Sequence, residues 1–134
     1  MQFTEKRIIE EQIKQFVTSD ERLTKKQTEV DEAEKDYEYL IKQYDGVPNL
    51  NLNDFEELHN AATKLHEKKE AFQRERIEGE KVAERVKEYM RIVPGITLRY
   101  VLERQFGVER RSVRQVFDIM YDAKGEELKC KEVS

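Results

Sequence analysis

The sequence has little of what secreted and membrane domains depend on. It contains one cysteine, two prolines, five glycines and no tryptophan in 134 residues. The single cysteine, Cys130, cannot form a disulfide within the chain, which fits a reducing compartment. No apolar run approaches the ~20 residues that span a bilayer, and no apolar segment of a signal peptide follows Met1. We therefore expect an intracellular protein, cytoplasmic or nuclear, that does not act in a membrane.

Apolar residues are also scarce. They make up 37% of the chain, whereas charged residues make up 40%. A compact globule needs a larger apolar share, but a long helix does not, because it buries only a narrow stripe. The net charge of −4 has the wrong sign for a general nucleic-acid coat. The composition therefore favours long, paired helices.

Large apolar residues recur every seven positions in two rows, and this period is typical of helices that pack along a coiled-coil seam. The first row is Ile9, Phe16, Leu23, Val30, Tyr37 and Tyr44, and the second is Leu58, Leu65, Phe72, Gly79, Val86 and Val93.

Two breaks divide the chain. Gly46 and Pro48 end a helix expected over about 4–44, and Pro94 with Gly95 ends a second over about 53–93. Asn51 or Asn53 can cap the second helix. Their similar lengths and short connection predict a mainly α fold, with residues 1–95 forming a long antiparallel helical hairpin or coiled coil.

A lone hairpin would leave apolar edges in water, so we predict that a second chain covers them. That chain is either another copy or a different coiled-coil subunit. The residues predicted to form this oligomer interface share the seam positions: Phe16, Leu23, Val30, Tyr37, Leu58, Leu65, Phe72 and Val86.

Residues 96–134 are predicted to form a small C-terminal head. Thr97 can cap a helix that ends before Gly107, a second helix is expected over about 109–123, and Leu128 and Cys130 alternate with lysines as in one short strand. With Leu102, Val113 and Val116 at fitting offsets from Gly107, this stretch resembles the helix-turn-helix of bacterial repressors. The resemblance implies that the second helix turns four side chains toward DNA: Arg110, Arg111, Arg114 and Gln115.

Three features favour a protein-docking head over a DNA-binding one. Glu103 stands where the repressor motif usually has a small residue, and the chain as a whole is acidic. The apolar residues of the second helix exceed what one face needs in so small a head. The predicted partner contacts are Val113, Phe117, Met120 and Tyr121.

No catalytic constellation is visible. His59 and His66 lie on one helical face without further zinc ligands of matching reach, Cys130 has no evident base, and no Gly-rich phosphate loop is present. We expect no enzyme, metal, cofactor or small-molecule substrate. The primary hypothesis is a non-enzymatic assembly or adaptor subunit of a multiprotein complex, which oligomerises through the coil and binds a protein partner through the head. The alternative is a DNA-binding transcriptional regulator with a helix-turn-helix at 99–118.

Overall fold

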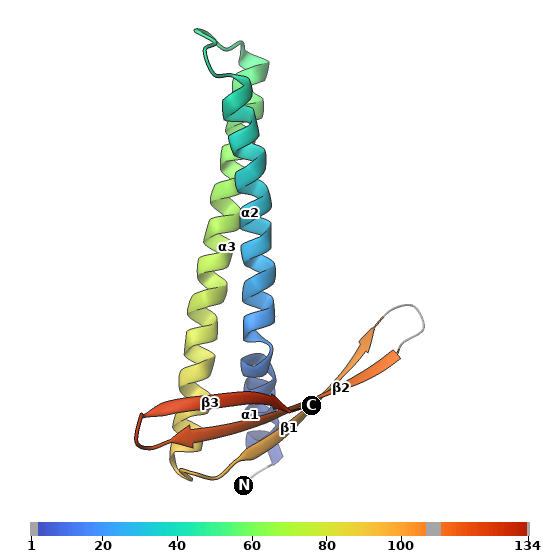
Figure 1. Ribbon diagram of the computed structural model, residues 1–134, viewed down its shortest axis with the longest axis vertical. Helices are drawn as coiled ribbons and strands as arrows, with labels where there is room; N and C mark the ends of the chain where they lie inside the picture. Colours follow the sequence, from blue (N-terminus) through green and yellow to red (C-terminus); the bar gives the residue numbers. More distant parts are fainter. Residues whose placement is uncertain (1–2, 107–110, 134) are drawn as a thin grey trace. The chain divides into compact units, whose positions relative to one another are not determined.

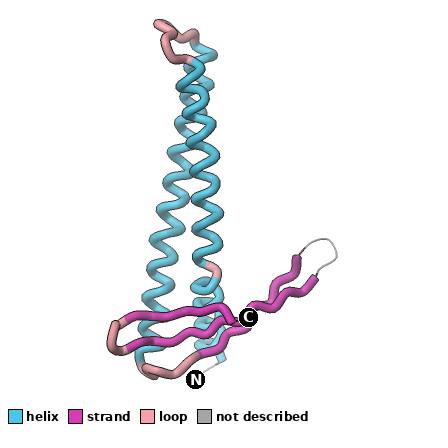
Figure 2. The backbone as a smooth tube through the Cα atoms, viewed as in Figure 1, coloured by secondary structure: helices cyan, strands magenta, loops and turns pink. Residues whose placement is uncertain are grey.

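The computed structural model describes residues 3–106 and 111–133. Three helices are followed by three strands (Figures 1 and 2): α1 (Phe3–Val17), α2 (Ser19–Gln43), α3 (Leu52–Arg91), β1 (Leu98–Phe106), β2 (Arg111–Asp122) and β3 (Glu127–Val133). The chain divides into two compact units. Unit 1 comprises residues 1–19 and 79–134, and unit 2 comprises residues 20–78.

Unit 2 consists of α2 and the first two thirds of α3, packed side by side. Val30 and Ala33 of α2 are buried with Leu65 of α3, and Tyr37 and Phe72 pack against them. Near the start of α2, the Arg22 Nε donates to Glu75 Oε1 at 2.8 Å. The order of these contacts makes the two helices antiparallel, and the apolar stripe with period seven supplies their common core.

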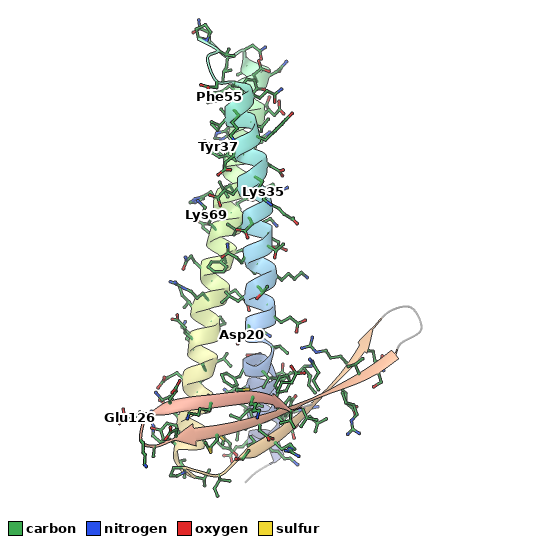
Figure 3. The ribbon with its side chains drawn as sticks, viewed as in Figure 1. Asp20, Lys35, Tyr37, Phe55, Lys69 and Glu126 are labelled. Carbon is green, nitrogen blue, oxygen red and sulfur yellow. The ribbon has the colours of Figure 1, made fainter. Side chains whose placement is uncertain are left out.

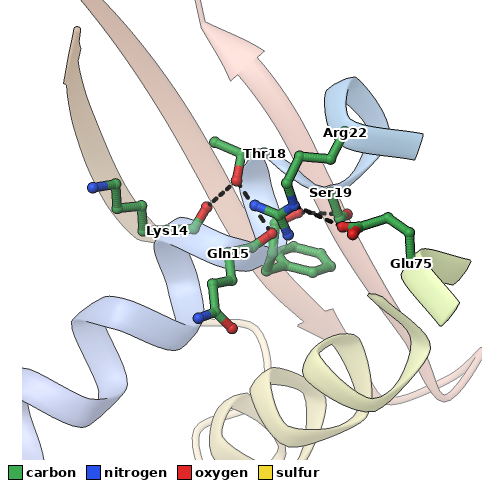
Figure 4. Close-up of polar contacts among 7 residues, drawn as sticks. Lys14, Gln15, Thr18, Ser19, Arg22 and Glu75 are labelled. Atoms are coloured by element: carbon green, nitrogen blue, oxygen red, sulfur yellow. Dashed lines mark hydrogen bonds and ion pairs between the residues drawn. The ribbon is translucent and has the colours of Figure 1, made fainter. Parts of the chain in front are cut away.

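A break at Thr18 separates α1 from α2, so the single helix predicted over 4–44 is wrong. Figure 4 shows the polar contacts around it. Thr18 Oγ1 donates to the Lys14 carbonyl at 2.8 Å, and Ser19 Oγ donates to the Phe16 carbonyl at 2.8 Å. Hydroxyls of this kind compete with backbone N–H groups for the carbonyls of the preceding turn. The break therefore occurs at two adjacent hydroxyl residues, without a glycine or proline.

Unit 1 contains an antiparallel sheet in the order β1-β2-β3. Leu98 pairs with Ile119, which in turn pairs with Cys130. Ile119 is fully buried, in one cluster with Ile13 of α1 and with three residues of α3. Those three are Val82, Val86 and Met90. The apolar face of the sheet therefore closes the core that α1 and the end of α3 begin.

The predicted fold class, a mainly α hairpin with a helix-turn-helix head, is wrong. Over residues 3–106 and 111–133 the structure has three helices and a three-stranded sheet, and the long α3 leads directly into that sheet. β1 replaces the expected helix over 97–106, and β2 replaces the one over 109–123; Gly107 and Arg110 lie outside the described residues. Phe117, Ile119 and Tyr121 are buried while the residues between them are not, which is the two-residue period of a strand with one buried face.

Candidate protein-interaction surface

The turn between α3 and β1 positions the most exposed apolar side chains of unit 1. Pro94 ends the helix, and Gly95 has a φ of +80°, which side-chain-bearing residues rarely adopt. The Gly95 N–H donates to the Tyr121 carbonyl at 3.2 Å, and the Ile96 N–H donates to the Val93 carbonyl at 3.2 Å. These bonds hold the turn against the end of β2.

Around this turn, three aliphatic side chains lie in water. Ile92 is 81% exposed and Ile96 is 60% exposed, and Val93 is exposed as well. Single exposed apolar residues are ordinary on protein surfaces, but three within five positions form a patch. Burial of such side chains by a partner would stabilise a complex, because each removes apolar area from water.

Two adjoining pockets extend this patch. One has a volume of about 300 Å³ and lies among the residues of the turn: Tyr89, Met90, Ile92, Val93, Ile96, Thr97 and Leu98. The other, of about 340 Å³, lies where α1 meets β1 and is lined by Lys6, Ile9, Glu10, Ile13, Tyr89, Leu98, Arg99 and Tyr100. Tyr89 and Leu98 line both pockets, so we treat the pockets and the patch as one surface, the turn surface.

Charged groups border the turn surface on the β1 side. The Arg99 guanidinium donates to Asp118 through Nε at 2.8 Å and through a second nitrogen at 3.0 Å. This hydrogen bond lowers the pKa of Asp118 and raises that of Arg99. Partial burial of Tyr100, with the nearby carboxylates of Glu10 and Glu11, raises the pKa of its phenol. Arg99 and Asp118 therefore stay ionised, and the phenol of Tyr100 stays neutral, across the physiological range.

The end of α3 is also fixed to the sheet from the other side. The Arg91 guanidinium lies over the ring of Tyr121, 5.7 Å from its centroid, a cation–π contact. Tyr121 thus contacts Arg91 through its ring and the turn through its backbone carbonyl. The turn surface is therefore joined to β2 by two contacts of one residue, which suits a preformed binding surface.

The four predicted head contacts are divided between the two faces of β2. Phe117 and Tyr121 are 8% and 5% exposed and belong to the buried face. Val113, on the same face by its spacing, is 44% exposed near the far end of the strand, and half-buried Met120 is on the opposite face. Two of the four residues therefore serve the core, and the other two do not share a surface. Contact of these residues with a partner stays a prediction.

Three of the four residues predicted to contact DNA, Arg111, Arg114 and Gln115, are on β2 rather than on a recognition helix. Arg110 lies outside the described residues, and Arg111 begins the strand. Arg114 Nε is 3.4 Å from Glu103 Oε1, and Gln115 Nε2 donates to Glu132 at 3.4 Å. Neighbouring carboxylates therefore occupy these two side chains.

The seam residues predicted for an oligomer interface pack within the chain. Val30, Leu65, Tyr37 and Phe72 form the cluster of unit 2. Phe16 and Val86 belong to the core of unit 1, where Val86 is fully buried. Leu23 and Leu58 are half-buried. An oligomer interface along this seam stays a prediction. It would use the exposed area of the seam side chains that are only half-buried within the chain.

Sequence reasoning missed Ile92 and Ile96. Their signal was local: isoleucine on each side of a Pro-Gly stop, where a helix end has little reason to place apolar side chains. The row of apolar residues with period seven ends at Val93 and includes neither isoleucine, so the periodicity did not single them out.

Other chemistry is limited in the part of the chain that the structure describes. No group of three or more potential metal ligands occurs over residues 3–106 and 111–133. Nor is any helix there long and apolar enough to cross a membrane. His66 pairs with Glu70 on the exposed side of α3, and Cys130 is exposed on β3. No protein-family model matches the chain, and neither a curated protein nor a solved structure is detectably similar to it.

Proposed function

We propose that this protein is a non-enzymatic assembly subunit that binds a protein partner through the turn surface. The observation that supports this most strongly is the set of exposed apolar side chains at Ile92, Val93 and Ile96, beside two pockets that share Tyr89 and Leu98. Apolar anchors that enter preformed pockets are the usual source of affinity between proteins.

The DNA-binding alternative depended on a recognition helix. A strand occupies that position, and Arg114 within this strand lies 3.4 Å from Glu103. No second function is therefore proposed.

The test is substitution of Ile92 and Ile96 by serine in the full chain. Both side chains are largely exposed, so the double variant should keep the helical circular dichroism and melting temperature of the wild type. A photo-crosslinking amino acid at position 96 should trap one partner in the cells that express the protein. Sedimentation velocity of the purified chain shows whether that partner is a second copy.

The matched control is Val101→Thr, a conservative change at an exposed position on the outward face of β1. Reconstituted binding to the trapped partner should weaken at least tenfold in the double variant and by less than twofold in the control. Equal binding by wild type and double variant, or a crosslink spread over many proteins together with a monomeric chain, would remove the basis for the proposal.

A further inference from the structure

A second set of exposed apolar side chains occurs in unit 2. We call this region the loop end; it comprises residues 36–59, which are the end of α2, its connection to α3, and the first two turns of α3. Phe55, labelled in Figure 3, is 56% exposed, and Leu52 is 79% exposed. Tyr39, Ile41 and Val47 are exposed as well. Five large apolar residues in water within 24 positions exceed the scatter expected on an ordinary surface.

The loop end also carries the negative charge of the chain. It has six carboxylates and one lysine, whereas the rest of the sequence sums to +1 against a total of −4. The carboxylates are Asp36, Glu38, Asp45, Asp54, Glu56 and Glu57. Among the described residues, none of the six is paired with a cation within 4 Å. In the rest of the sequence, lysines and arginines balance the acidic residues in number, so the excess of negative charge is local.

Hydrogen bonds hold the loop end together. The Tyr44 hydroxyl at the end of α2 lies 3.2 Å from Glu57 Oε2 and 3.3 Å from Asp54 Oδ1, both on α3. Asn51 Oδ1 caps α3 by accepting from the Asp54 N–H at 2.8 Å. These bonds join the connection to the start of α3, between the two helices that carry four of the five exposed apolar residues.

We propose that the loop end is a docking site for a basic amphipathic segment of another protein, one that combines lysine or arginine with apolar anchors. Charge complementarity selects this occupant. Nucleic acid and anionic membrane carry the same sign as the loop end, and two loop ends would repel each other. The apolar residues supply the contact area, and the carboxylates at its border discriminate between partners.

The probe is a fluorescein-labelled 18-residue peptide of leucine and lysine, with leucines spaced to form one helical face. Binding to the full chain is followed by fluorescence anisotropy. A Kd below about 100 µM is expected, weakening as salt rises because the attraction is ionic. Leu52→Ser with Phe55→Ser should weaken binding at least tenfold. Glu56→Lys should weaken it at least threefold.

Two matched controls locate the site. Ile77→Ser removes an exposed apolar residue of α3 outside the loop end, and Glu67→Lys reverses an exposed charge there. Each control should leave the Kd within twofold, and circular dichroism confirms that all variants fold. Equal weakening by the controls would overturn the proposal, as would the absence of binding at 1 mM. Self-association that depends on Leu52 and Phe55, or binding of vesicles rich in phosphatidylserine, would overturn it in favour of another occupant.

Discussion

The strand assignment of residues 111–122 makes a sharp prediction about two neighbouring side chains. Ile119 is fully buried against α1 and α3, whereas Met120 is half-buried on the opposite face of the sheet. Replacement of Ile119 by alanine should therefore destabilise unit 1 strongly, and the same replacement of Met120 should not. A helix over these residues predicts the reverse, because Val113, Val116 and Met120 would then share its buried face and Ile119 would lie outside it.

The magnitude follows from burial. Complete burial of an isoleucine side chain contributes roughly 1.5–3 kcal/mol, and the cavity left by Ile→Ala adds to the loss, which totals about 2–5 kcal/mol in well-packed cores. For Ile119 we expect about 3 kcal/mol, a factor of roughly 100 in the unfolding equilibrium. Met120 loses only partly buried area, so its substitution should cost below ~1.5 kcal/mol.

Hydrogen exchange read by mass spectrometry is the suitable assay, because it reports peptides from β1 to β3 separately from those of unit 2. Protection of the strands should fall in Ile119→Ala and remain near that of the wild type in Met120→Ala, with α2 unaffected in both. A larger loss of protection in Met120→Ala, or equal losses in the two variants, would refute the strand register.

Two further predictions concern single positions in each unit. The pKa of the Tyr44 phenol is raised to about 12. The causes are partial loss of water around the phenol, hydrogen bonds to Glu57 and Asp54, and the charge of both carboxylates. The pKa in the folded chain lies above the ordinary value near 10. The stability that the neutral phenol contributes to the folded state should therefore be fully present below pH ~10 and be lost as the pH rises toward 12. Ultraviolet titration of the wild type against Tyr44→Phe should show this late phenolate, and a Tyr44 that titrates near 10 would contradict it. Gly79→Ala should raise the melting temperature, because alanine favours a helix over glycine by up to ~1 kcal/mol. The added Cβ would lie 3.8 Å from Ser19 Cβ, an ordinary contact distance. A lower melting temperature would show that α3 needs glycine at this position.

The helices of the chain were largely predictable because their signals are local. The stretch from 53 to 93 was expected to be helical, and α3 runs from Leu52 to Arg91 with Asn51 as its cap. Caps and helix stops act through neighbouring residues, so the sequence alone reveals them. The break at Thr18 was missed because hydroxyl residues are tolerated inside helices and interrupt them only in some settings.

The sheet was not predicted because its sequence fits two periods. Val113, Val116, Phe117 and Met120 have helical spacing, whereas Phe117, Ile119 and Tyr121 alternate as in a strand. The elements that pack against this segment decide between the two periods. Those elements are α1 and α3, which contribute Ile13, Val82, Val86 and Met90 to the core that contains Ile119. Ile13 lies 106 residues before Ile119 in the sequence, so tertiary packing with distant residues overrode the local pattern.

The same difference changes which residues can report on partner binding. Had 109–123 been a helix, Phe117 and Tyr121 would have been candidates for contact with another protein. As parts of a strand they are buried, and Tyr121 also holds the turn through its carbonyl and Arg91 through its ring. Substitution of Phe117 would disturb the buried face of the sheet, and substitution of Tyr121 would disturb the core and the turn surface together, so a loss of binding could not be assigned to contact. Substitution of Ile92 and Ile96 should cost the isolated chain little stability, because their side chains are mostly exposed to water. A binding defect at these two positions, with folding intact, therefore separates recognition from stability.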